Sequence, residues 1–289
     1  MLKIKKLVII GVGLIGGSLA IALRNARVVE SIVGCGRSEE NLERGVQLGV
    51  IDSYSTEVAH AVKDADMVFI AVPLGAMKKV FRQLHGHLPA NAIVTDGGSA
   101  KASVVQDWIE VFGDDAQFVP GHPIAGTENS GVEAALPDLY RNRRIIVTPT
   151  ATTVESHLKQ VTQMWEACGA EVSLMSVEHH DQVLAATSHL PHMIAFGLVE
   201  TLAELEEHTE IFKYAAGGFR DFSRIASSNP EMWRDICLSN GPALSAVLDN
   251  YIEHLQAMNA LIKASDGEAL LKSFRVAKQA RDDYVDGLS

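Results

Sequence analysis

Short apolar runs alternate with amphipathic stretches over the first half of the chain. The runs are rich in valine and isoleucine, as buried parallel strands are, and the segments between them have helical spacing. We predict strands over Leu7–Ile10, Ser31–Cys35, Met67–Val72, Ala92–Asp96, Gln117–Val119 and Ile145–Pro149, then a helix over about Thr153–Cys168 and a strand over Glu171–Met175. This order predicts an α/β fold with a doubly wound parallel sheet.

The first apolar run leads directly into a glycine-rich turn followed by a helical pattern, with the sequence Gly11-Val12-Gly13-Leu14-Ile15-Gly16. In a Rossmann-type dinucleotide site the first glycine permits the tight turn, the second admits a pyrophosphate and the third lets helix pack on strand. The free N–H groups at the start of the helix favour a diphosphate. We therefore predict a nicotinamide-dependent enzyme.

Ligands of such sheets bind beyond the carboxyl ends of the strands. The loops around Pro73, Ser99 and His122 should therefore converge, and we expect Val72 and Pro73 to contact the cofactor together with the glycine turn.

From Ser176 onward the pattern is helical, with almost no strand signal. We predict a dinucleotide-binding domain over residues 1–175 and an all-α domain over 176–289, which would provide a substrate floor and a dimerisation surface. A length of 289 residues suits two domains.

The charge and the cysteines exclude several classes of protein. A formal charge of −11 argues against a nucleic-acid partner, although local cations can still bind a small anionic substrate. Cys35, Cys168 and Cys237 are widely spaced, which is untypical of a disulfide framework or a zinc site and suits the cytoplasm. Three lysines precede the uncharged stretch Leu7–Leu23, but its glycines and its length favour a turn over a membrane anchor.

The end of the second strand bears on the choice of cofactor. An acidic residue there usually binds the adenosine ribose of NAD, whereas this chain has Arg37 and Ser38. Both could bind a 2′-phosphate, so we expect NADP. In the alternative, Arg37 is an ordinary surface residue, Glu39 or Glu40 binds the ribose, and the cofactor is NAD.

Histidines and an arginine supply the candidate chemistry. His122 follows a predicted strand, in a loop where a substrate would meet the nicotinamide, and modest tuning of its pKa would make it a general base. Four further histidines lie close together, at positions 179, 180, 189 and 192, but their spacing and the absence of cysteine favour substrate contacts or structural hydrogen bonds over a metal.

Arg224 lies in a mostly apolar stretch, so we expect it to be buried and to need an anionic partner. That partner is either a substrate carboxylate or one of two nearby aspartates, Asp221 and Asp235.

Four segments together resemble the prephenate/arogenate (cyclohexadienyl) dehydrogenase family of tyrosine biosynthesis, over roughly Leu7–Tyr284. They read DGGSAK from Asp96, GHPIAGTE from Gly121, SHLPH from Ser188 and DFSRIASSNPEMWRDI from Asp221. The resemblance implies oxidative decarboxylation of prephenate or arogenate with hydride transfer to NAD(P), no metal, and a homodimer formed by the helical domain.

Roles for individual residues follow from the same resemblance. His122 would accept the proton of the substrate's 4-hydroxyl, Ser99 would bind that hydroxyl and orient His122, and Arg224 would bind the ring carboxylate. His189 would lie at the substrate or nicotinamide end of the cleft. Four residues would complete the pocket: Thr127, Glu128, Asp221 and Trp233. Either subunit of the dimer could supply the tryptophan.

Two other functions remain alternatives. A β-hydroxyacid dehydrogenase or imine reductase shares the architecture, but the catalytic lysine of the former has no counterpart here, since residues 161–212 contain no Lys or Arg. The second alternative is a non-catalytic regulator that binds a nicotinamide dinucleotide. Neither accounts for the set of Ser99, His122 and Arg224.

Overall fold

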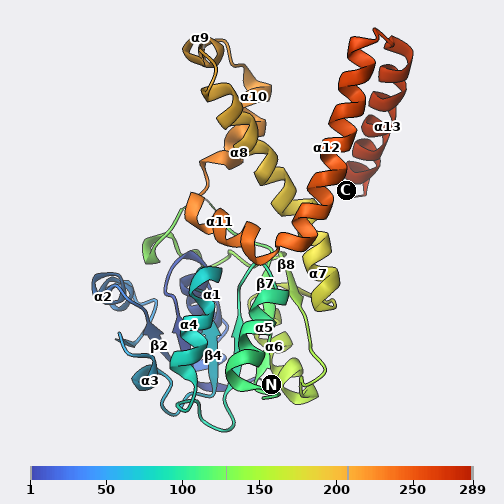
Figure 1. Ribbon diagram of the computed structural model, residues 1–289. Coiled ribbons are helices and arrows are strands. Elements are labelled where there is room, and N and C mark those ends of the chain that lie inside the picture. The colour runs from blue at the N-terminus through green and yellow to red at the C-terminus, as the bar shows by residue number, and fades with distance from the viewer. Residues whose placement is uncertain (1, 128, 207, 288–289) are drawn as a thin grey trace. The chain divides into compact units, whose positions relative to one another are not determined.

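Six parallel strands form the main sheet, in the order β3-β2-β1-β4-β5-β6. Two of them, β2 and β4, are labelled in Figure 1. The computed structural model describes residues 2–127, 129–206 and 208–287, and the chain divides into two compact units, Met1–Gly241 and Pro242–Ser289. The strands are β1 (Ile4–Ile10), β2 (Val29–Cys35), β3 (Ser53–Ser55), β4 (Met67–Ile70), β5 (Ile93–Asp96) and β6 (Phe118–Val119). Their order and direction confirm the predicted doubly wound α/β fold.

Successive residues of β1 enter separate cores on the two faces of the sheet, because side chains alternate along a strand. Leu7 and Ile9 pack in one core with α1 (Leu14–Asn25), α2 (Glu39–Gln47) and α6 (Glu155–Ala167). Val8 and Ile10 pack in the other with α3 (Val58–Ala61), α4 (Leu74–Leu84) and α5 (Ala102–Phe112). Burial on both faces explains why the strands are continuously apolar in sequence.

A second, three-stranded sheet consists of β7 (Gly121–Pro123), β8 (Arg144–Val147) and β9 (Glu171–Leu174). β7 runs antiparallel to β8 and pairs His122 with Ile146. The prediction that His122 lies in a loop is therefore wrong. Pro120 has no N–H group to extend the pairing of β6 with β5, and the chain changes sheets there.

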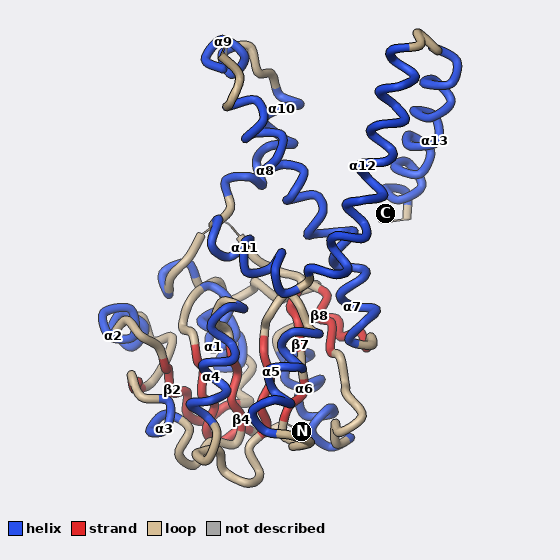
Figure 2. The backbone as a smooth tube through the Cα atoms, viewed as in Figure 1, coloured by secondary structure: helices blue, strands red, loops and turns tan. Residues whose placement is uncertain are grey.

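The rest of the first unit is helical (Figure 2). Its elements are α7 (Val177–Leu184), a π turn (Ala185–His189), α8 (Leu190–Ala203), α9 (His208–Lys213), α10 (Gly217–Ser223), a 3₁₀ turn (Arg224–Ser227) and α11 (Pro230–Ser239). Pro191 lies in the first turn of α8 and lacks the N–H group of a regular helical bond, so α7 and α8 meet through the wider π turn.

The second unit contains most of α12 (Gly241–Lys263) and all of α13 (Gly267–Asp286). Several large apolar residues of these helices are exposed in the single chain, among them Ile262, Phe274 and Val276. No helix within the described residues is long and apolar enough to span a bilayer. Strand structure ends with β9, whereas the compact units divide only after Gly241, and the domain boundary near residue 175 stays a prediction.

The glycine turn joins β1 to α1 with little space to spare. Gly11 has a φ of 99°, which favours glycine, and a Cβ atom on Gly16 would lie 2.2 Å from the carbonyl oxygen of Gly11. A Cβ atom on Gly13, in contrast, would meet no atom within 4 Å. The first and third glycines therefore serve packing, and the second faces open space.

We expect Gly16→Ala to lower the free energy of unfolding by about 3 kcal/mol, the upper end for overpacking, because the clash is with backbone. Gly13→Ala is the matched control and should change it by less than about 1 kcal/mol. Urea unfolding of both variants measures the difference. Equal stability of the two would contradict the packing role of Gly16.

Candidate active site

The exits of several strands meet next to the glycine turn. A Cβ atom on Gly97, which follows β5, would lie 3.4 Å from Ile15 of α1 and 3.6 Å from Pro123 of β7. On Gly98 it would lie 2.9 Å from Leu74, the first residue of α4. Three loops predicted to converge are thus brought together.

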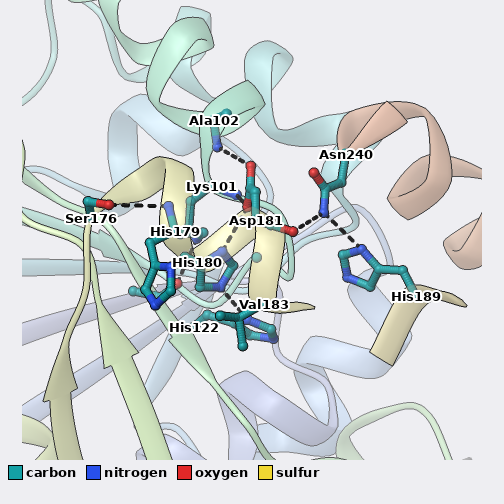
Figure 3. A network of polar contacts seen from close by, with 12 residues as sticks. Lys101, Ala102, His122, Ser176, His179, His180, Asp181, Val183, His189 and Asn240 are labelled. Atoms are coloured by element: carbon teal, nitrogen blue, oxygen red, sulfur yellow. Dashed lines mark hydrogen bonds and ion pairs between the residues drawn. The ribbon is translucent and has the colours of Figure 1, made fainter. Parts of the chain in front are cut away.

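His122 lies in this region, on β7, and is joined to a second histidine. Its side chain is 9% exposed, and its Nδ1 atom lies 2.8 Å from Nε2 of His180, which is fully buried (Figure 3). His180 Nδ1 in turn lies 2.7 Å from Oδ1 of Asp181. No hydrogen bond of His122 Nε2 is found among the described residues, which leaves that atom for a ligand.

Asp181 connects these histidines to the start of α5. The N–H groups of Lys101 and Ala102 donate to its two carboxylate oxygens, each at 2.8 Å. Burial raises the pKa of Asp181, but the hydrogen bonds from His180 and these N–H groups outweigh burial and hold it below its ordinary value. Asp181 is therefore a carboxylate at neutral pH.

The side chain of Lys101 is completely buried beneath the same residues. Its Nζ donates to the Asp96 carboxylate and, at 2.7 Å, to the carbonyl oxygen of Gly121. Burial lowers the pKa of Lys101, and the charge of Asp96 opposes that shift. This ion pair holds the end of β5 against the start of β7, next to His122.

Burial sets the electrostatics of His122. Desolvation is the largest cause that lowers its pKa well below 6.5, and the neighbouring His180 and Lys101 lower it further. The imidazole is therefore neutral at physiological pH, as a general base must be before it accepts a proton.

A third histidine, His189, lies at the end of the π turn and is 1% exposed. Asn240 Nδ2 donates to the carbonyl oxygen of Asp181 at 2.8 Å and lies 3.1 Å from His189 Nδ1. His189 Nε2 is buried and makes no well-formed hydrogen bond among the described residues, although the Ser99 backbone lies near the ring, and burial is the largest cause that lowers the pKa of His189 to about 4. Within the described part of the chain, no three His, Cys, Asp or Glu residues are placed to hold a metal ion.

Trp233 of α11 stacks on His192, with ring centroids 3.6 Å apart, so this tryptophan packs within its own subunit. Arg224 lies near enough to lower the pKa of His192, although burial is the larger cause. Arg224 is exposed, and the expectation that it would be buried is wrong, because the short 3₁₀ turn that carries it contains no buried residue. It makes no ion pair with Asp221 or Asp235 in the described chain, where Asp235 pairs with Arg234 instead.

Other expected site residues make no hydrogen bond with His122 in the part of the chain that the structure describes. Ser99 is half-buried, and no hydrogen bond from its hydroxyl to His122 is found among the described residues. Thr127 lines a separate cavity of about 610 Å³ with Arg141 and Arg143. Asp221 is exposed on α10, and Glu128 lies outside the described residues. The roles given to these residues stay predictions.

A cavity of about 580 Å³ extends from the glycine turn to the end of β2. Six of the expected cofactor residues line it: Gly11, Gly13, Arg37, Ser38, Val72 and Pro73. Leu14, Ile15 and Gly16 form the first turn of α1 beside it. Open space at Gly13 and a helix N-terminus are what a dinucleotide diphosphate needs, so the residues fit such a group.

The end of this cavity at β2 is cationic. Arg37 and Lys79 line it, and among the described residues no Asp or Glu does. Ser38 caps α2 by accepting from the N–H of Asn41, whose side chain donates to the Val12 carbonyl oxygen at 2.7 Å and so supports the glycine turn. Glu39, the alternative ribose ligand, accepts from the Tyr54 hydroxyl instead.

Sequence reasoning missed Lys101, Asp181, Asn240 and Lys79 as parts of these sites, and gave no individual role to His180. A signal for His180 exists in the helical spacing. His180 and Leu184 are four residues apart and both buried, whereas His179 is exposed. The ion pair of Lys101 with Asp96 had no such signal, since it depends on how β5 exits the sheet.

Two family models cover the chain. Residues 19–174 match the nucleotide-binding domain of prephenate dehydrogenase, and residues 176–276 match its dimerization domain. The chain belongs to the prephenate dehydrogenase family. A cyclohexadienyl dehydrogenase of Zymomonas mobilis is 38% identical over 96% of this chain and 95% of its own length.

Solved structures agree with membership of this family. A prephenate dehydrogenase of A. aeolicus, in complex with hydroxyphenyl propionate and NAD+, has a TM-score of 0.92 and 38% identity, over 98% of this chain and 99% of its own. An arogenate dehydrogenase of Synechocystis has a TM-score of 0.82 and 29% identity, over 96% and 99% of the two chains.

We expect Lys101→Met to lower the free energy of unfolding by about 3–5 kcal/mol, since it leaves the buried Asp96 carboxylate without its cation. Lys63→Met, on an exposed loop, is the control and should change it by less than about 0.5 kcal/mol. Urea denaturation of both proteins tests this. A Lys101→Met protein as stable as the control would show that the ion pair is dispensable.

Proposed function

We propose that this member of the prephenate dehydrogenase family catalyses the oxidative decarboxylation of prephenate, arogenate or both, with a nicotinamide dinucleotide, in tyrosine biosynthesis. The observation that carries the proposal is His122, a buried and neutral imidazole with its Nε2 atom free, next to the turn and cavity that fit a dinucleotide. The names of the similar proteins from Z. mobilis, A. aeolicus and Synechocystis support it.

His122 acts as the general base. When bound, the nicotinamide supplies the acceptor for the substrate's hydride. His122 Nε2 accepts the proton of the 4-hydroxyl, and loss of the ring carboxylate as carbon dioxide makes the product aromatic. Because the pKa of His122 is below 6.5, the base is ready over the whole neutral range.

The remaining residues bind and orient the substrate. Arg224 is exposed and without a protein anion among the described residues, which leaves its guanidinium for a substrate carboxylate. His189 has a buried Nε2 atom that makes no well-formed hydrogen bond among the described residues, and Trp233 packs against its neighbour His192. Ser99 lies in the loop between β5 and α5 and would bind the 4-hydroxyl. Thr127, Glu128 and Asp221 complete the pocket in this proposal.

We infer NADP as the preferred cofactor, with NAD as the alternative. Arg37 and Lys79 would bind the 2′-phosphate, and the usual partner of the NAD ribose is missing because no carboxylate of the described residues lines the cavity. We further propose a cytoplasmic homodimer, supported by the dimerization-domain match and by the exposed apolar residues of α12 and α13.

The deciding experiment mixes the purified chain with prephenate or arogenate, each with NAD or NADP, and follows the absorbance of the reduced nicotinamide. Turnover in any pairing establishes the activity and identifies substrate and cofactor. Silence in all four, from protein that still binds a dinucleotide, would refute the proposal.

We expect His122→Asn to lower kcat about 10²–10⁴-fold, the usual contribution of a general base. The dissociation constant of the dinucleotide, measured by fluorescence titration, should stay within about twofold, because His122 does not line its cavity. His87→Asn, exposed in the turn after α4, is the control. Near-normal turnover of His122→Asn would remove this residue from the mechanism.

We expect Arg37→Ala to raise the KM for NADP about tenfold or more, since a hydrogen bond to a charged group is worth about 1.5–3 kcal/mol. The KM for NAD should change less than about twofold. Arg82→Ala removes an exposed cation of α4 outside the cavity and should alter neither value. Equal effects of Arg37→Ala on both cofactors would favour the NAD alternative.

A further inference from the structure

His122 is the end of a chain of three side chains whose protons can be assigned from their partners. His122 Nδ1 lies 2.8 Å from His180 Nε2, and His180 Nδ1 lies 2.7 Å from Asp181 Oδ1 (Figure 3). Neutral imidazole carries one N–H group and one lone pair, so the direction of each hydrogen bond decides the next.

Asp181 fixes the first direction. Both of its carboxylate oxygens accept from backbone N–H groups, those of Lys101 and Ala102, which only donate. An ionised carboxylate has no proton to give, so His180 Nδ1 is the donor of their shared hydrogen bond. The other nitrogen of a neutral His180, Nε2, then carries a lone pair.

His122 completes the sequence. Facing a lone pair on His180 Nε2, its Nδ1 atom must carry the hydrogen, and its Nε2 atom must carry the lone pair. Burial keeps the pKa of His180 below its ordinary value although the hydrogen bond that His180 donates to Asp181 raises it, which agrees with a neutral relay.

We propose that His180 is a positioning residue which, anchored by Asp181, holds His122 in the tautomer protonated on Nδ1, with Nε2 free to accept the substrate's proton. The catalytic consequence rests on the proposed function, whereas the tautomer itself is a property of the free protein.

The anchor is rigid for reasons visible in the fold. The Asp181 carboxylate lies at the N-terminus of α5, where the helix dipole favours negative charge, and Asn240 holds the Asp181 carbonyl oxygen. His180 itself is fully buried, so it can adopt no alternative hydrogen bond to water without moving α7. The relay therefore ties the orientation of the base to the junction of α7 with α5.

The tautomer is tested first in the wild-type chain without substrate. Histidine side chains labelled with ¹⁵N give long-range ¹H–¹⁵N correlations that distinguish a protonated from an unprotonated ring nitrogen, and comparison with His122→Asn assigns the His122 signals. We expect His122 to be protonated on Nδ1. A spectrum with its proton on Nε2 would overturn the proposal.

Variants of His180 then test the consequence. His180→Phe keeps the ring volume but removes the acceptor, and we expect kcat to fall about 10²–10⁴-fold, the full contribution of a general base. The KM for the dinucleotide should stay within twofold, and the His122 spectrum should lose its Nδ1–H form. His180→Gln can still present an acceptor oxygen to His122 and should recover kcat to within about tenfold of wild type. His179→Phe, exposed on the preceding position, is the control and should behave as wild type.

The outcomes separate this proposal from the function it serves. His180→Phe with wild-type kcat and an intact Nδ1–H signal would overturn it, as would equal losses in His180→Phe and His180→Gln. Should wild type show the expected tautomer but turn over none of the four substrate and cofactor pairs, the proposed function fails and the positioning role stands.

Discussion

The candidate site depends on how the Asp181 carboxylate is satisfied. It is removed from bulk water, and a buried charge is tolerated only when hydrogen bonds replace its hydration. Three donors do so: the N–H groups of Lys101 and Ala102, and the ring of His180. Because these donors come from both the Rossmann-type part and the helical part of the first unit, one carboxylate fixes the position of α7 against the start of α5.

Around this anchor, backbone irregularities place the other groups. Pro120 moves the chain out of the parallel sheet so that His122 can lie on β7, and Pro191 accompanies the π turn that ends at His189. π turns often occur at functional sites because the extra residue re-aims a side chain. In both places a proline prevents regular hydrogen bonding, and a histidine of the site lies within two residues of it.

Features of the fold that leave a local pattern in the sequence could be predicted, whereas features that depend on the tertiary structure could not. Apolar runs and the glycine turn depend on local pattern, and they predicted the parallel sheet and the position of the cofactor cavity. The second sheet was not predicted, because β7 is the three-residue segment Gly121–Pro123 without an apolar run, and its antiparallel pairing with β8 has no local signal. The burial of Arg224 was wrongly expected from apolar neighbours in sequence, which in a short 3₁₀ turn do not bury it. His122 was identified by its motif, whereas its partner His180 requires knowing which side of α7 faces the sheet.

Burial, rather than an ion pair, sets the pKa of the candidate base His122, and this arrangement has a chemical consequence. A carboxylate in direct contact would stabilise the protonated imidazole and raise its pKa. The charge of Asp181 reaches His122 only through the neutral ring of His180, and the nearby charge of Lys101 is paired with Asp96. His122 thus receives orientation from the relay without receiving a strong preference for the charged state. A base of low pKa binds its proton weakly, so it returns to the neutral form soon after each proton transfer, and the same burial that keeps it neutral also keeps its ring in one place.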